Sequence, residues 1–192
     1  MLEPRNQKHK QRKAERTERR WHARGRTDWV PYAQWVQEAN RLRQELPPGV
    51  DETLKRHEDA GTTDSPEYIE AMQVFYDRHV CRVVPNPDCV TRSFSQLAQD
   101  PTVYHTMNGP SEFHCIGSLR SWNITDDLHR ISVPTLLISG RYDEATPVIV
   151  STIHERIPGS EWVLFEESSH MPHIEEPAAF QSTLAAFLDR CD

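Results

Sequence analysis

The stretch V-P-T-L-L-I-S-G-R-Y-D-E-A-T-P, from Val133 to Pro147, decides the fold class. Its apolar run is short and is bounded by a proline and a glycine, which is typical of a buried parallel strand. The residues after the glycine lead to Thr146–Pro147, a typical helix start. We therefore expect a strand, then a turn that carries the carboxylate of Asp143, then a helix.

The same alternation continues to the end of the chain. P-G-S at 158–160 ends the helix, E-W-V-L-F at 161–165 has the composition of a second strand, and a last helix follows a loop. A strand–helix–strand unit of this length requires a right-handed crossover and two parallel strands, which we expect to be neighbours. The pattern predicts the end of a doubly wound α/β sheet. The apolar residues expected to face inward are Val148, Val150, Ile153 and Ile157 in the first helix, and Phe180, Leu184, Phe187 and Leu188 in the last.

Residues 29–125 show a helical period with proline turns and almost no strand signal. One helix is expected from Tyr32 to Leu46, before the P-P-G turn at 47–49. Another is expected to begin at the N-cap Ser65, with Pro66 in its first position. Its inward residues are predicted to be Ile69, Met72 and Tyr76. We interpret 29–125 as a helical cap and 126–192 as the α/β core segment.

The N-terminal residues 1–28 have a different composition. Residues 1–26 hold ten Lys/Arg against three Asp/Glu, whereas 27–192 hold twelve basic and twenty-six acidic residues. With so few apolar side chains, this arm is predicted to be disordered. Nucleic-acid binding is the alternative, but a basic run without interleaved aromatic residues is weak support for it.

The composition also bears on location. No apolar run is long enough to span a membrane, and no apolar segment follows the basic N-terminus as in a secretory signal. The four cysteines, Cys81, Cys89, Cys115 and Cys191, are widely spaced and form no C-x-x-C. Free thiols in a reducing compartment are therefore expected, and the predicted location is the cytoplasm.

Two candidate catalytic residues follow the two predicted strands. Asp143 lies just past the first strand and His170 lies in the loop past the second. Adjacent parallel strands are about 4.8 Å apart, so both side chains should emerge at one sheet edge within reach of each other. An acid followed by a histidine is also the order of the last two members of an α/β-hydrolase triad. Metal binding by His170 and His173 is the alternative, but there is no obvious third ligand, so neither a metal nor a cofactor is predicted.

The nucleophile of such a triad is absent from this sequence. A nucleophile elbow needs G-x-S-x-G, because the sharp turn leaves no room for side chains beside the serine. The seven glycines stand at positions 25, 49, 61, 109, 117, 140 and 159, and no two are four apart. No two are adjacent either, so an oxyanion loop of the H-G-G type is also missing.

Three runs carry a resemblance to a known family: V-Y-H-T-M-N-G-P-S-E-F-H at 103–114, S-G-R-Y-D-E-A-T-P at 139–147, and S-S-H-M-P-H-I-E-E-P at 168–177. With them, the chain from about Val30 to Arg190 resembles the C-terminal portion of the prolyl iminopeptidases. These are serine aminopeptidases of the α/β-hydrolase fold that release N-terminal proline, and sometimes other residues, from peptides. W-N-I at 122–124 departs slightly from the Trp-Asp-Ile that the family often shows.

The resemblance assigns roles to four residues. Asp143 resembles the triad acid and His170 the general base, while Glu112 resembles a cap carboxylate that binds the free α-amine of the substrate. Glu144 resembles the partner of Glu112. A buried ammonium needs charged acceptors, so Glu112 and Glu144 are expected to converge on one cavity near His170.

Three functions are therefore open from the sequence. The first is a proline iminopeptidase-like hydrolase that acts on peptides with a free N-terminus, lacks the nucleophile half and is inactive alone. The second is a non-catalytic protein that binds peptides or a partner with the same pocket. The third is a nucleic-acid-associated module that uses the basic arm. No oligomeric state is predicted.

Overall fold

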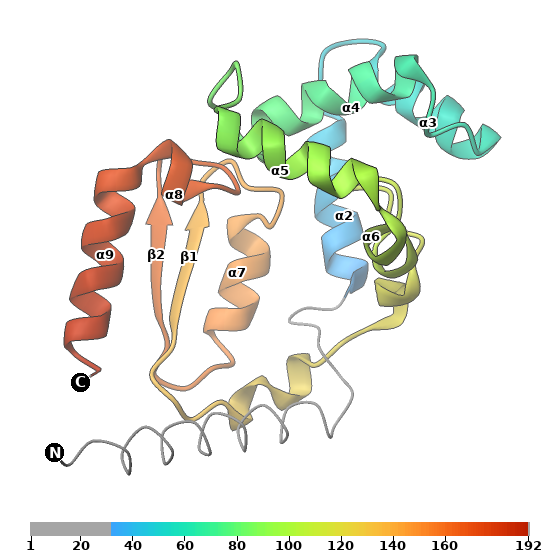
Figure 1. The fold of residues 1–192 in the computed structure, drawn as a ribbon. Helices are drawn as coiled ribbons and strands as arrows, with labels where there is room; N and C mark the ends of the chain where they lie inside the picture. Colours follow the sequence, from blue (N-terminus) through green and yellow to red (C-terminus); the bar gives the residue numbers. More distant parts are fainter. Residues whose placement is uncertain (1–31, 192) are drawn as a thin grey trace, which may run out of the picture.

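The computed structural model describes residues 32–191, which fold into helices and a pair of strands (Figure 1). The predicted arm at 1–28 lies outside the described residues, and the domain boundary at 125/126 stays a prediction. In chain order, the elements are α2 (Tyr32–Arg43), α3 (Val50–Ala60), α4 (Pro66–His79), α5 (Asp88–Gln99), α6 (Thr102–Met107), the 3₁₀ helices η1 (Ser118–Ser121) and η2 (Thr125–Arg130), β1 (Leu136–Gly140), α7 (Pro147–His154), β2 (Glu161–Phe165), α8 (Pro172–Glu175) and α9 (Pro177–Asp189).

The two strands form the predicted parallel pair. Their register runs from Leu136 opposite Glu161 to Gly140 opposite Phe165. Both strands therefore end at the same level, and the loops that follow them leave the sheet side by side. The expectation that β1 and β2 are parallel neighbours is confirmed.

Helices α7 and α9 flank the strand pair (Figure 1). From α7, Ile149 and Val150 are buried, and the Phe165 ring of β2 lies 6.4 Å from the Phe180 ring of α9. The prediction that Val148 faces inward is wrong, because its side chain is 54% exposed. Val148 shares a helix face with Thr152, one turn later, and that face is turned toward α2, where Gln34 donates to Thr152 Oγ1 at 3.1 Å.

The last helix also differs from the sequence prediction. Leu184 is 37% exposed and Leu188 is 52% exposed, although both were expected to be inward. A terminal helix of a doubly wound fold packs over several strands, but among residues 32–191 the sheet has only two strands. The apolar face of α9 is therefore only partly covered.

Helices α2, α3 and α4 build a separate hydrophobic core in the predicted cap. The buried residues of this core are Ala39, Leu42, Leu46, Leu54, Tyr68, Ala71, Phe75 and Phe113. Ser65 caps α4 as predicted, because its side chain accepts a hydrogen bond from the Tyr68 backbone N–H at 3.2 Å. The predicted inward face was displaced by one position, since Tyr68 is buried whereas Ile69 is 48% exposed.

The cap lies over the carboxyl ends of the strands. Figure 1 shows both arrowheads at the end of the sheet nearest α5 and α8. A buried hydrogen bond of 2.8 Å from Thr146 Oγ1 to Glu38 Oε2 joins the start of α7 to α2. The sheet edge at which open α/β folds bind ligands is therefore enclosed between the cap and the strand ends. No helix in the described part of the chain is both long and apolar enough to cross a membrane.

Candidate active site

Asp143 is held in place by the turn that ends β1. Its backbone N–H donates to the Gly140 carbonyl at 3.4 Å, and its Oδ1 accepts from the Ala145 backbone N–H at 2.8 Å. Only 5% of the residue is exposed. The carboxylate is therefore fixed by its own turn before any partner side chain is considered.

His170 meets Asp143 from the loop after β2. The His170 Nδ1 lies 3.0 Å from Asp143 Oδ1, so the prediction that the two side chains come within hydrogen-bond reach is confirmed. A carboxylate can only accept, so Nδ1 carries the proton and Nε2 is the bare nitrogen of the neutral ring. Partial desolvation lowers the pKa of His170, whose side chain is 46% exposed, but the hydrogen bond to Asp143 and the charges of Asp143, Glu112 and Glu175 together raise it overall.

The two loops approach each other so closely that Gly140 has no room for a side chain. A Cβ on Gly140 would lie 2.1 Å from the Ser169 carbonyl oxygen and 2.3 Å from that of Ser168. The loops are also joined directly, because the Tyr142 N–H donates to the Ser168 carbonyl at 3.0 Å. The glycine of the sequence motif is therefore required by the approach of the His170 loop.

Glu144 is a buried carboxylate beside this pair. It is 2% exposed, and its Oε1 lies 3.9 Å from His170 Nδ1. Its Oε2 has no hydrogen-bond partner among the described residues. Burial raises the pKa of Glu144 well above its ordinary value, and the charges of Glu112 and Asp143 raise it further.

Glu112 reaches the same region from the cap. Its Oε1 accepts a hydrogen bond of 2.8 Å from the Tyr104 hydroxyl. Burial raises the pKa of Glu112, while the Tyr104 bond and the charge of His170 partly offset that rise. The charge of Glu112 raises the pKa of Glu144, and the charge of His170 lowers the pKa of Glu112. The three side chains therefore share one electrostatic environment, although Glu112 and Glu144 come from different substructures.

The cap fixes the segment that carries Glu112. The Trp35 indole donates to the Glu112 carbonyl at 2.8 Å, and the Glu112 N–H donates to the Tyr76 hydroxyl at 3.4 Å. Just before it, the buried Ser111 hydroxyl lies 3.0 Å from the Tyr68 hydroxyl. Glu112 therefore projects from a part of the cap that is tied to α2 and α4.

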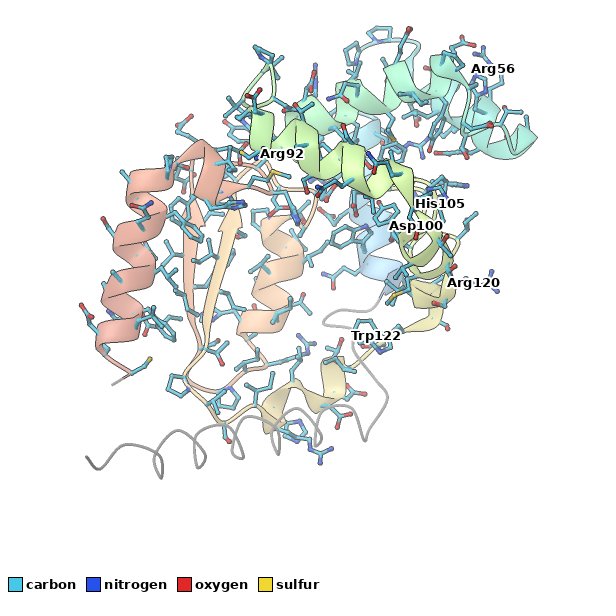
Figure 2. The ribbon with its side chains drawn as sticks, in the orientation of Figure 1. Arg56, Arg92, Asp100, His105, Arg120 and Trp122 are labelled. Atoms are coloured by element: carbon cyan, nitrogen blue, oxygen red, sulfur yellow. The ribbon has the colours of Figure 1, made fainter. Side chains whose placement is uncertain are left out.

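An apolar cavity of about 610 Å³ adjoins Glu112. Glu112 and Ala145 are among its lining residues, whereas Glu144 is not, so only one of the two predicted carboxylates faces it directly. Asp100 and Trp122, labelled in Figure 2, line it from two separate segments of the cap. The remaining lining residues are Trp35, Leu97, Val103, Tyr104, Met107, Asn108, Leu119, Ile149, Val150 and Ile153.

The structure adds residues that the sequence analysis did not single out. Tyr104 lies within a quoted motif and binds Glu112, and burial raises the pKa of its hydroxyl, which keeps it a donor. His79 and Glu175 contact the loops of Asp143 and His170, respectively. Their residue types alone did not indicate a role for any of these three residues.

The structure also bears on the alternative of metal binding. The ring of His173, the predicted alternative metal ligand, packs 5.8 Å from that of Phe180, and residues 32–191 contain no cluster of three metal-binding side chains.

The fold and the site together define a class. Parallel strands followed by an acid and then a histidine, beneath a helical cap, are the C-terminal part of an α/β hydrolase. Within that class, comparison with known sequences and structures shows that the chain is similar to proline iminopeptidases.

No family model matches the chain. It is 40% identical over 161 residues to the proline iminopeptidase of Saccharolobus solfataricus, covering 84% of this chain and 51% of that protein. The proline iminopeptidase of Thermoplasma volcanium is 36% identical over 155 residues, which are 81% of this chain and 52% of that protein. The chain thus spans about half the length of these curated relatives.

Two crystal structures agree with the sequence matches. VinJ superposes with a TM-score of 0.82 at 49% identity, over 84% of this chain and 54% of VinJ. The proline iminopeptidase of Mycobacterium smegmatis gives a TM-score of 0.75 at 42% identity, over 84% and 54%. The similarity therefore includes both the cap and the strand pair.

Proposed function

We propose that this chain provides the acid, the base and the amine-binding carboxylates of a proline iminopeptidase-type hydrolysis. The observation that carries the proposal is the buried Glu144 Oε2, which has no hydrogen-bond partner within residues 32–191 and lies close to Glu112 and to the Asp143–His170 pair. Within residues 32–191, no Lys or Arg forms an ion pair with Glu112 or Glu144. Two buried acids without a Lys or Arg partner would bind the ammonium of a substrate well.

The proposed roles follow from the geometry. Asp143 holds the ring of His170 with the proton on Nδ1 and stabilises the imidazolium, so that Nε2 accepts the proton of the attacking hydroxyl. Glu112 and Glu144 bind the free amine of a peptide, which limits cleavage to the N-terminal residue. The apolar cavity beside Glu112 takes the apolar part of the substrate.

The nucleophile in this proposal lies outside the 192 residues, since they contain no G-x-S-x-G. The chain alone is therefore expected not to hydrolyse prolyl amides. Losing the nucleophile of a serine triad costs about 10⁶ in kcat. We place the protein in the cytoplasm, because Cys81, Cys89, Cys115 and Cys191 are all free thiols.

A complementation assay tests the function. The purified chain is assayed with a chromogenic proline amide, alone and with the part of the Mycobacterium smegmatis enzyme that it does not match. We expect no turnover alone, and turnover in the complex that His170→Ala abolishes. A complex that forms but stays inactive contradicts the catalytic proposal and favours the non-catalytic peptide-binding alternative. Turnover by the chain alone that His170→Ala abolishes would show that a nucleophile lies within it.

A further inference from the structure

The end of α4 touches both catalytic loops, although it belongs to the cap. His79 is the last residue of α4, and Arg82 lies in the connection to α5. Figure 1 shows this connection and α8 at the same end of the sheet. Neither His79 nor Arg82 lines the apolar cavity beside Glu112, and both make contacts that hold the two loops.

The first set of contacts reaches the acid loop. His79 Nδ1 donates to the Tyr142 carbonyl at 2.8 Å, and the His79 carbonyl accepts from the Glu144 N–H at 3.3 Å. These bonds lie on either side of Asp143. The guanidinium of Arg82 also stacks 3.8 Å from the centre of the Tyr142 ring.

His79 suits this role because its environment keeps it neutral. It is 6% exposed, its Nε2 has no hydrogen-bond partner among the described residues, and its ring lies 4.8 Å from that of Phe75. Burial lowers the pKa of His79. A neutral ring with its proton on Nδ1 can make one fixed bond to Tyr142, with no charge to compensate.

The second set of contacts reaches the base loop through Glu175. Glu175 Oε2 accepts from the Ser169 N–H at 2.8 Å and from the Met171 N–H at 3.1 Å, which are the backbone groups on either side of His170. Its Oε1 accepts from the Ser169 hydroxyl and from the Arg82 N–H, both at 2.7 Å. One carboxylate therefore ties the loop of His170 to the cap.

We propose that His79, Arg82 and Glu175 form a brace that sets the distance between Asp143 and His170. Each catalytic residue is held by hydrogen bonds on both of its sides, and both sets of bonds lead to the same four-residue segment of the cap. A shift of the cap moves both loops together, so their relative position is kept. His79 and Glu175 are thus positioning residues of the acid–base pair.

The brace rests on the proposed function, because it positions the pair assigned there as acid and base. Its test measures only the geometry of that pair and needs no turnover. The brace can therefore fail while the catalytic proposal stands, and the reverse also holds.

Nuclear magnetic resonance of the full chain with ¹⁵N-labelled histidine gives two readouts. One is the exchange rate of the His170 Nδ1 proton with water, and the other is the titration midpoint of His170. His79→Phe keeps an aromatic ring beside Phe75 but removes the donor to Tyr142. We expect exchange to become about five- to tenfold faster, the factor equivalent to one net hydrogen bond. The midpoint should move down, because the bond to Asp143 raises it.

Three further variants make the result specific. His79→Gln keeps a donor and should restore most of the parent behaviour. Glu175→Asp keeps the charge but shortens the side chain, so it should also speed the exchange of the His170 proton. Trp162→Phe is the control, since it removes one hydrogen bond of 2.9 Å between the two strands, to Ser139, which involves neither catalytic residue. It should change neither readout.

The brace is overturned if His79→Phe behaves like the parent chain. It is also overturned if Trp162→Phe changes the His170 readouts as much as His79→Phe, because the effect would then reflect a general loss of stability. If His79→Phe does not fold, Glu175→Asp decides the matter. Parent-like exchange in that variant would contradict the brace, and faster exchange would support it.

Discussion

Replacing Glu144 by glutamine should make the chain more stable near pH 6 and reduce the dependence of its stability on pH. Glu144 is 2% exposed, and one of its oxygens lacks a partner within the described residues. Burial and the charges of Glu112 and Asp143 raise the pKa of Glu144 well above its ordinary value of 4.5. The ionised form therefore opposes folding, and glutamine has the shape of the neutral form that the fold prefers.

The sign and size follow from proton linkage. The stability linked to Glu144 is fully present below pH 4.5 and is lost as the pH rises through the higher value of the folded chain. Where the folded state holds one proton more than the unfolded state, the unfolding free energy falls by up to about 1.4 kcal/mol for each unit by which the pH rises. The pKa of His170 is also raised, but its contribution changes only above its ordinary value of 6.5. Burial lowers the pKa of His79, so its contribution also changes in this range, with the opposite sign, but it is shared by the parent chain and Glu144→Gln. The difference between these two chains at about pH 5 to 6 therefore reports on Glu144.

Urea unfolding followed by tryptophan fluorescence measures this effect. Between about pH 5 and pH 6, the parent chain should lose on the order of 1 kcal/mol relative to Glu144→Gln, which should be the more stable protein at pH 6. Glu155→Gln is the control, because Glu155 is exposed at the end of α7. If Glu144→Gln is less stable than the parent at pH 6, or keeps its full slope, the reasoning about two buried acids is refuted.

Two further predictions concern the fold that positions the site. Gly140→Ala should destabilise the chain by about 1–3 kcal/mol in urea unfolding, because its Cβ would lie 2.1 Å from the Ser169 carbonyl oxygen. Parent-like stability would contradict the close loop approach. Phe75→Ala should cost about 3–5 kcal/mol, since Phe75 is fully buried in the cap core. Ile69 lies on the same helix but is 48% exposed, so Ile69→Ala should change the unfolding free energy by no more than about 0.5 kcal/mol. Equal losses of stability in Phe75→Ala and Ile69→Ala would contradict the assigned helix face.

The strand pair and its catalytic residues could be predicted from the sequence because they depend on local signals. A short apolar run between Pro134 and Gly140 marks a strand, and a crossover of this length makes the next strand parallel and adjacent. Asp143 and His170 follow the ends of these strands and so must meet. Ser65 was also predictable, since an N-cap depends only on the next few residues.

Contacts between the cap and the loops could not be predicted in this way. His79 and Tyr142 are 63 positions apart and meet only because the cap folds over the sheet. The inward face of α4 was misplaced by one residue, because apolar residues occur on both of its faces. The periodicity of the sequence does not indicate whether Tyr68 or Ile69 is buried. Packing of α4 against α2 and α3 determines that Tyr68 is the buried residue.

The most direct test of the account is whether the chain recognises a free amine beside His170. L-prolinamide and N-acetyl-L-prolinamide are titrated into the ¹⁵N-histidine-labelled chain and into Glu112→Gln. The account predicts that prolinamide shifts the His170 signals saturably and that the acetylated compound does not. The Glu112→Gln variant should bind prolinamide at least about tenfold more weakly, since a hydrogen bond to a charged group contributes about 1.5–3 kcal/mol. Equal binding of both compounds, or binding that Glu112→Gln leaves unchanged, would contradict the account.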